Sequence, residues 1–157
     1  MHNVNVKILN PMLHEADISY ASEQAAGVDL RACIDKPIII KPHQIVKVPT
    51  GIAIAAELGE DKSFVDNPFC YLLFGRSGLG VKHGITLANS VGVIDADYRG
   101  EIVAGLINHS DEPFTINPLD RVAQLVMMPI NLMAFNFVTE LNDTARGSGG
   151  FGSTGTK

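Results

Sequence analysis

Two segments of the chain carry side chains that could bind and cleave a phosphate chain. Residues 75–80 read Gly-Arg-Ser-Gly-Leu-Gly and combine a guanidinium and a hydroxyl with small residues, whose backbone N–H groups can approach an anion closely. Residues 86–101 include Asp95, Asp97 and Tyr98, and a carboxylate in such a segment can act as a general base toward water. On a strand the two aspartates would share a face, whereas a turn would separate them. Each segment alone is also typical of a solvated surface turn.

The C-terminal residues 142–157 are rich in Gly, Ser and Thr and carry one arginine, Arg146, and one aromatic residue, Phe151. This composition cannot bury enough apolar surface to order itself, so we expect a flexible arm after a body formed by residues 1–141. A terminus without a role is one interpretation. The other is an anion-binding guanidinium and a stacking ring on a chain that is free to wrap around a ligand.

The elements that must position these residues are short apolar runs separated by turn residues, a pattern typical of all-β domains. The runs are residues 4–9, 38–40, 44–48, 51–55, 102–108 and 122–128. We expect residues 86–101 to form a β-hairpin from two strand-like halves. We expect residues 66–74 to form one or two helical turns, with Asp66 as N-cap and Pro68 in the first turn. The sequence therefore predicts an all-β, jelly-roll-like barrel or sandwich with one short helix.

The composition limits the classes of function. At 157 residues the chain has the size of one domain, and its net charge of −5 argues against sequence-independent binding to DNA or RNA. No apolar run approaches the ~20 residues that cross a bilayer, and no secretory signal is evident, so we expect a soluble, cytoplasmic protein that binds no membrane. Cys33 and Cys70 lack C-x-x-C spacing, and we expect them to be buried, reduced thiols.

Five segments, in order and at suitable separations, resemble the five motifs of the homotrimeric dUTPase family. They are residues 26–32, 75–80, 89–100, 121–125 and 146–155. The resemblance implies an enzyme that hydrolyses dUTP to dUMP and pyrophosphate, which supplies dUMP for thymidylate synthesis and keeps uracil out of DNA. Many relatives have proline before the arginine of the second motif, where this chain has Gly75; the departure concerns the stiffness of the loop.

The resemblance also implies roles for the residues that would contact the phosphates. Arg76, Ser77 and Gly78 of the second motif would bind the triphosphate. Gln124 of the fourth motif would place the α-phosphate and the attacking water, while Arg121 would belong to the structural frame.

For the base and the sugar, the third motif would carry the contacts. Asn89 and the main chain of Val93 and Ile94 would face the uracil edge. Asp95 would be the base for the attacking water, and Tyr98 would lie under the deoxyribose and leave no room for a 2′-hydroxyl.

In the fifth motif, Arg146 would pair with the terminal phosphates, and the segment of Phe151, Gly152 and Ser153 would close over the uracil. The resemblance implies a homotrimer with sites between subunits. Mg²⁺ would be bound mainly by triphosphate oxygens and waters. Asp29 is a candidate for outer-sphere contact with this ion, and its alternative role is structural, holding a turn after Gly27.

Two other functions are compatible with parts of the pattern. A dCTP deaminase of the same fold would carry a catalytic glutamate on the strand after the third motif, but this chain has Gly105 there. A non-catalytic dUTP-sensing module would need neither Asp95 nor the complete arm. The histidines show no ligand spacing and are assigned no role in catalysis; for His83, near the phosphate turn, we expect a hydrogen-bonding role in the frame.

Overall fold

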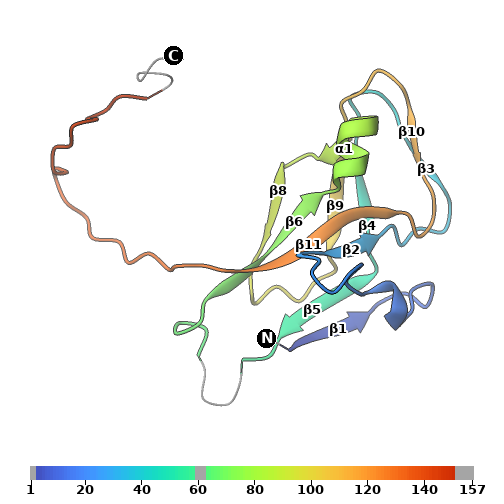
Figure 1. Cartoon of the computed structure of the whole chain (residues 1–157), viewed down its shortest axis with the longest axis horizontal. Helices are drawn as coiled ribbons and strands as arrows, with labels where there is room; N and C mark the ends of the chain where they lie inside the picture. The colour runs from blue at the N-terminus through green and yellow to red at the C-terminus, as the bar shows by residue number, and fades with distance from the viewer. Residues whose placement is uncertain (1–2, 59–62, 151–157) are drawn as a thin grey trace.

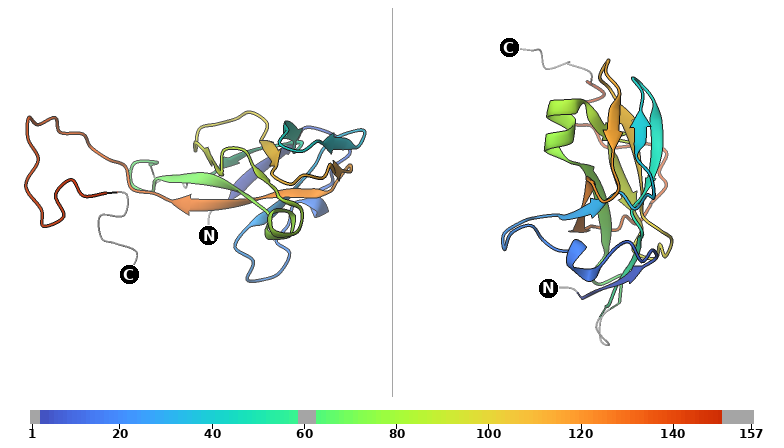
Figure 2. Two further views of the ribbon diagram at one scale, coloured as in Figure 1. Left: turned by 90° about the horizontal axis from the view of Figure 1, so that it is seen from above. Right: turned by 90° about the vertical axis from the view of Figure 1, so that its right-hand side faces the viewer.

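The computed structural model describes residues 3–58 and 63–150 and shows a body of short β-strands with one α-helix (Figure 1). In chain order the elements are β1 (Val4–Ile8), η1 (Glu15–Asp17), β2 (Val28–Arg31), β3 (Ile38–Ile40), β4 (Ile45–Pro49), β5 (Ile52–Ala56), β6 (Phe69–Gly75), α1 (Ser77–His83), β7 (Ile85–Leu87), β8 (Val91–Ile94), β9 (Val103–Asn108), β10 (Phe114–Ile116) and β11 (Arg121–Pro129). Residues 131–150 contain no strand and extend away from the body (Figures 1 and 2).

The strands form four antiparallel sheets. One has the order β2-β11-β6-β8, a second has the order β4-β9-β7, and the pairs β1-β5 and β10-β3 complete the body. The all-β, jelly-roll-like prediction is therefore confirmed. No helix among the described residues is long and apolar enough to cross a membrane.

The core lies between the sheets and follows from the period of two along each strand. In β9, Ala104, Leu106 and Asn108 are fully buried and alternate with more exposed residues. Val48 of β4 and Val122 of β11 are buried in the same core. Burial of each such aliphatic side chain stabilises the fold by roughly 1.5–3 kcal/mol.

Asn108 is a buried polar side chain whose hydrogen bonds are satisfied. Its Nδ2 donates to the carbonyl oxygens of Ile40 at 3.0 Å and Glu112 at 2.7 Å. Its Oδ1 accepts from the main-chain N–H and the hydroxyl of Ser110, at 2.9 and 2.7 Å. The amide thereby ties the end of β9 to β3 and to the following turn, without an unpaired polar group in the core.

The prediction of a helix at residues 66–74 is wrong. Ser63 and Asp66 form a turn through their side chains, and β6 begins at Phe69. β6 is paired on both sides, by β11 and β8, so its apolar residues form an almost continuous run, and such a run does not distinguish a buried strand from a helix. In the described part of the chain the one α-helix is α1, directly after β6, and Gly84, with φ of 68°, caps its C-terminal end.

The predicted hairpin is also different from the observed structure. Its two halves, β7 and β8, do not pair with each other: β7 pairs with β9, and β8 pairs with β6. The turn between them contains Ser90 with φ of 64°. The hairpin that does form joins β7 to β9, and its two arms separate beyond the hydrogen bond from Ala88 N–H to the Gly105 carbonyl.

Cys33 and Cys70 are buried and unpaired, as expected from the sequence. Burial raises the pKa of both thiols, with smaller contributions from Glu101 and Asp35 at Cys33 and from Asp95 at Cys70. Cys33 also fills the space above Gly51, whose φ is 71°. An ideal Cβ on Gly51 would lie 2.6 Å from both Cys33 Sγ and Leu13 Cδ1.

We predict that Gly51→Ala lowers the free energy of unfolding by about 2–4 kcal/mol, because the left-handed backbone and the overpacking both oppose a side chain there. Urea unfolding would measure this loss. Gly105→Ala is the matched control, since a Cβ on Gly105 meets no atom within 4 Å. Equal stabilities of the two variants would contradict the prediction.

Candidate functional site

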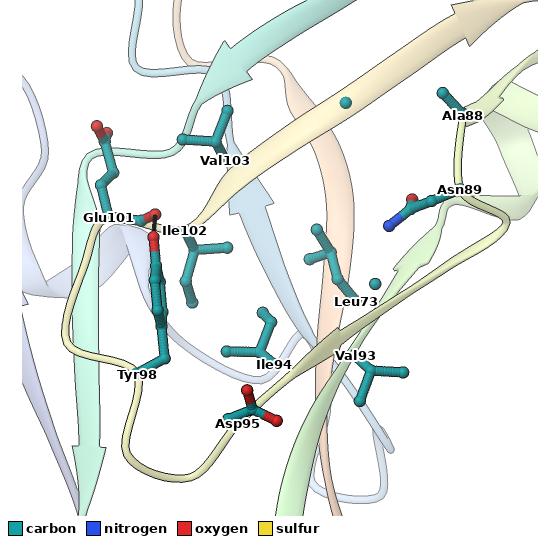
Figure 3. Close-up of a pocket in the computed structure, with 12 residues that line it drawn as sticks. Leu73, Ala88, Asn89, Val93, Ile94, Asp95, Tyr98, Glu101, Ile102 and Val103 are labelled. Atoms are coloured by element: carbon teal, nitrogen blue, oxygen red, sulfur yellow. Dashed lines mark hydrogen bonds between the residues drawn. The ribbon is translucent and has the colours of Figure 1, made fainter.

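The separated arms of the β7–β9 hairpin enclose a cavity of about 380 Å³ (Figure 3). We call it the β8–β9 cavity. Asn89, Gly92, Val93, Ile94 and Asp95 line it from the first arm, and Glu101, Ile102, Val103 and Gly105 line it from the second, with Ala88, Leu73 and Tyr98 completing it. β8 is the edge strand of its sheet, so backbone donors and acceptors on its outer side are available to a ligand.

Two glycines shape this cavity from opposite arms. A Cβ on Gly92 would lie 3.1 Å from Leu73 Cβ, so the absence of a side chain allows β8 to pack closely on β6. A Cβ on Gly105 would meet nothing within 4 Å, so this position borders open space. The amide of Asn89 points into the cavity (Figure 3). The cavity therefore has open space beside β9 and a polar amide on its wall.

The turn after β8 separates the two aspartates. The N–H of Tyr98 donates to the Asp95 carbonyl at 3.1 Å, and of the pair only Asp95 lines the cavity. The Tyr98 ring stands at the same end of the cavity, with 46% of the residue exposed. Gly100 makes this possible, because a Cβ there would lie 2.6 Å from Tyr98 Cζ. A carboxylate and an aromatic ring thus face the same space.

A second group of charged side chains lies at the other edge of the β2-β11-β6-β8 sheet. Asp29 Oδ1 accepts from Arg76 Nε at 2.8 Å, and Asp29 Oδ2 accepts from Arg76 Nη2 at 3.4 Å and from Arg121 Nη1 at 3.2 Å. We call these three residues the Asp29 cluster. Two guanidinium groups and one carboxylate leave a net charge of +1, which suits an anionic ligand.

The cluster leaves donors free for such a ligand. Arg76 also donates from Nη1 to the Arg121 carbonyl at 3.2 Å, so three of its five N–H groups are used within the chain. Two remain, and their direction is fixed by the paired contact with Asp29. Ser77 and Gly78 follow as the first residues of α1, and both are exposed. Their N–H groups have no partner within the helix, because the first turn never supplies one.

Gln124 is held between two glycines beside this cluster. Its Nε2 donates to the Gly75 carbonyl at 3.0 Å, and its Oε1 lies 3.1 Å from an ideal Cβ on Gly27. Gln124 faces Asp29 on β2 and Phe74 on β6 in the strand register. The orientation of this amide therefore depends on two glycines, one directly before β2 and one at the end of β6.

One chain does not bring all of the predicted residues together. In the register Asp29, Gln124, Phe74 and Val91 lie in line across the sheet, so the Asp29 main chain lies three strand spacings, about 14 Å, from β8. The Arg76 side chain extends from the end of β6 to Asp29. Arg146 lies on the extended arm, where its Nε donates to the Gly149 carbonyl at 3.0 Å. The predicted contacts of Phe151, Gly152 and Ser153 lie outside the described residues.

Metal ligands are few in the part of the chain that the structure describes. No group of three or more His, Cys, Asp or Glu side chains there is arranged to hold a metal ion. At Asp29, three of about four lone-pair positions accept from arginines, which leaves about one for a water molecule. Asp29 thus fits outer-sphere contact with a hydrated cation but not direct ligation. It lies within β2 and holds two arginines, rather than a turn after Gly27.

Two features of the site were not found from the sequence. Glu101 lies at the end of the β8–β9 cavity, and its carboxylate accepts from the Gly51 N–H at 2.8 Å. Arg121, expected in the frame, pairs with Asp29 and also borders a second cavity with Arg76. His83, expected to form a hydrogen bond in the frame, instead packs its ring against Phe114 at 4.9 Å. These contacts join residues far apart in the chain, so no local pattern indicates them.

The fold and the site define an all-β, jelly-roll-like protein with a polar cavity and a separate cationic cluster. The family model described as dUTPase matches residues 14–155. The chain therefore belongs to the dUTPase family.

Individual relatives agree with this assignment. A protein of Janthinobacterium sp. (strain Marseille), named deoxyuridine 5′-triphosphate nucleotidohydrolase, is 45% identical over 155 residues, which cover 99% of each chain. The structure of dUTPase from Streptococcus mutans has a TM-score of 0.67 at 31% identity, covering 83% of this chain and 98% of that one. A mutant dUTPase of Staphylococcus bacteriophage 80alpha, solved with dUpNHpp, has a TM-score of 0.79 at 22% identity, covering 98% and 99%.

We predict that Asp29→Asn releases the Arg76 guanidinium. Loss of the charge-assisted contacts should accelerate exchange of the Arg76 Nε proton roughly tenfold or more, the factor that corresponds to about 1.4 kcal/mol. Proton-exchange NMR on the arginine side chains would measure it. Asp35→Asn, which removes an exposed carboxylate elsewhere, should leave the Arg76 signal unchanged. An Arg76 exchange rate that is equal in both variants would refute the role of Asp29.

Proposed function

We propose that this protein is a dUTP diphosphatase, which hydrolyses dUTP to dUMP and pyrophosphate and so supplies dUMP for thymidylate synthesis and keeps uracil out of DNA. The observation that carries the proposal is the β8–β9 cavity, in which Asn89, Asp95 and Tyr98 face one space, in a member of the dUTPase family. The names of the relatives support the same activity.

Recognition of the base follows from the edge strand. Uracil presents an acceptor, a donor and an acceptor along O4, N3–H and O2, and the main chain at Val93 and Ile94, with the Asn89 amide, offers complementary groups. Cytosine reverses two of these three. Each buried polar group left without a partner costs about 1–3 kcal/mol, so dCTP is rejected. Tyr98 lies under the sugar and leaves no room for a 2′-hydroxyl.

In the chemical step, Asp95 accepts a proton from a water molecule, and the water oxygen forms a bond to the α-phosphorus. The bond between the α-phosphorus and the bridging oxygen breaks, and pyrophosphate leaves with the electron pair. Gln124 orients the water and the α-phosphate. Arg76, Ser77 and Gly78 contact the phosphates through their free N–H and hydroxyl groups, which stabilise the developing negative charge.

The arm and a divalent cation complete this site. Arg146 pairs with the terminal phosphates, and Phe151, Gly152 and Ser153 close over the base. Mg²⁺ bound by triphosphate oxygens and waters would supply neutralisation of charge on the phosphates. Asp29 would contact such a hydrated ion only through water, because three of its lone pairs accept from arginines.

The site is shared between subunits of a homotrimer. The separation of the β8–β9 cavity from the Asp29 cluster supports this arrangement, since a cavity of one chain can face the cluster of another. The arm supports it as well, because it leaves the body before the fifth motif begins.

Neither alternative function, deaminase or non-catalytic sensor, accounts for the residues of the β8–β9 cavity. A deaminase that attacks C4 of cytosine needs a carboxylate on β9, and Gly105 presents only a bare Cα to the cavity. A non-catalytic dUTP sensor has no requirement for Asp95 at the cavity wall.

Pyrophosphate release from dUTP, dCTP, dTTP and UTP, each with Mg²⁺, tests the proposed function. We expect release from dUTP alone, its loss on addition of EDTA, and its return with excess Mg²⁺. Binding of dUTP without release would favour the sensor, and ammonia from dCTP would favour the deaminase.

A second test addresses Asp95 and the shared site together. Asp95→Asn should retain dUTP binding and lose nearly all hydrolysis, and Arg76→Ala should lose hydrolysis through weaker phosphate binding. Trimers refolded from an equal mixture of the two inactive variants should recover about one quarter of the wild-type rate, because random assortment pairs an intact Asp95 with an intact Arg76 in that share of sites. No recovery would mean that both residues act within one chain.

A further inference from the structure

Glu101 connects the rigid core to the aromatic ring of the β8–β9 cavity. Its carboxylate accepts a hydrogen bond from the Gly51 N–H at 2.8 Å, and its own main-chain carbonyl accepts one from the Tyr98 hydroxyl at 3.0 Å. In Figure 3 the carboxylate points away from the cavity, while the carbonyl faces Tyr98. Glu101 is therefore placed to act on a ligand through Tyr98 rather than by contact.

The point to which Glu101 is anchored has little freedom to move. Gly51 is buried, and an ideal Cβ there would overlap Cys33 and Leu13. Its carbonyl accepts from the Leu9 N–H at 2.8 Å. The N–H that holds the Glu101 carboxylate thus belongs to a backbone fixed on both sides by the core.

The Tyr98 ring, in contrast, is carried by an exposed turn. Asp97, Tyr98, Arg99 and Gly100 are all exposed. The hydroxyl contact with the Glu101 carbonyl fixes the far end of the ring, so the ring position depends on where residue 101 is held.

We propose that Glu101 is a positioning residue for sugar selectivity. By its hydrogen bond to Gly51 it holds the Tyr98 ring at the distance from the sugar that admits a 2′-deoxyribose and excludes a 2′-hydroxyl. This inference rests on the proposed function, because Tyr98 selects the sugar only if a deoxyribonucleotide occupies the cavity. Without this anchor the main chain at residue 101 is held only through its neighbour Ile102, whose N–H donates to the Ile52 carbonyl at 2.9 Å, so the ring can shift and ribonucleotides enter.

The test compares kcat/KM for dUTP with kcat/KM for UTP in the full-length trimer. This ratio is independent of the fraction of folded enzyme, so a merely structural effect of a substitution does not change it. We expect Glu101→Ala to lower the dUTP/UTP ratio about tenfold, the factor that corresponds to loss of one hydrogen bond. Glu101→Gln should keep a ratio close to wild type, because its amide oxygen still accepts from Gly51. Asp97→Asn, which removes a carboxylate from the same turn, is the control and should leave the ratio unchanged.

A double-mutant cycle tests whether Glu101 acts through the ring. Tyr98→Phe should lower the ratio by a similar factor, and Tyr98→Phe with Glu101→Ala should be no less selective than Tyr98→Phe alone. The proposal would be overturned if the two substitutions lowered the dUTP/UTP ratio by the product of their separate factors, or if Glu101→Ala kept the wild-type ratio. If Glu101→Ala does not fold, Glu101→Asp serves instead, since its shorter side chain does not reach Gly51. Failure of the proposed function is distinct: the wild-type protein would then release no pyrophosphate from dUTP.

Discussion

Residues 85–94 change their strand-pairing partner partway along, and this is the constraint on which the rest of the structure depends. Its first part, β7, must pair with β9, and its last part, β8, must pair with β6 in another sheet. Each part is paired along one side only if the chain crosses from one sheet to the other, which the left-handed backbone at Ser90 allows. The space left between the departing strand and β9 is the β8–β9 cavity. The site thus results from sheet pairing and not from a loop added to the body.

The Asp29 cluster meets a different requirement, that of fixing the direction of two arginine side chains. A free arginine side chain would lose considerable rotamer entropy on binding, whereas Arg76 is already fixed by its paired contact with Asp29. The carboxylate lowers the net positive charge of the cluster but leaves it at +1. Preorganisation is therefore obtained at the expense of some electrostatic attraction, and Arg121 offsets part of that loss.

The sequence predicts the strands well wherever apolar runs are bounded by turn residues, as in β1, β3, β4, β5 and β11. It fails at residues 66–74, because β6 is paired on both sides and its apolar run has no clear period. It places Asn89, Asp95 and Tyr98 on one segment, and the structure brings these residues to one cavity. The arginine partners of Asp29 and the contact of the Glu101 carboxylate with Gly51 could not be predicted, because these contacts join residues 47 or more positions apart and depend on sheet order.

The bare Cα of Gly105 has a consequence for the evolution of this fold. Because the position borders open space within the cavity and lies on a strand fixed from both sides, a side chain can be introduced there without rearranging the backbone. Glycine codons ending in a purine become glutamate codons by one nucleotide change. A protein with this body can therefore acquire an ionisable group inside the β8–β9 cavity in a single mutational step, so that new chemistry can arise in lineages that keep the same scaffold.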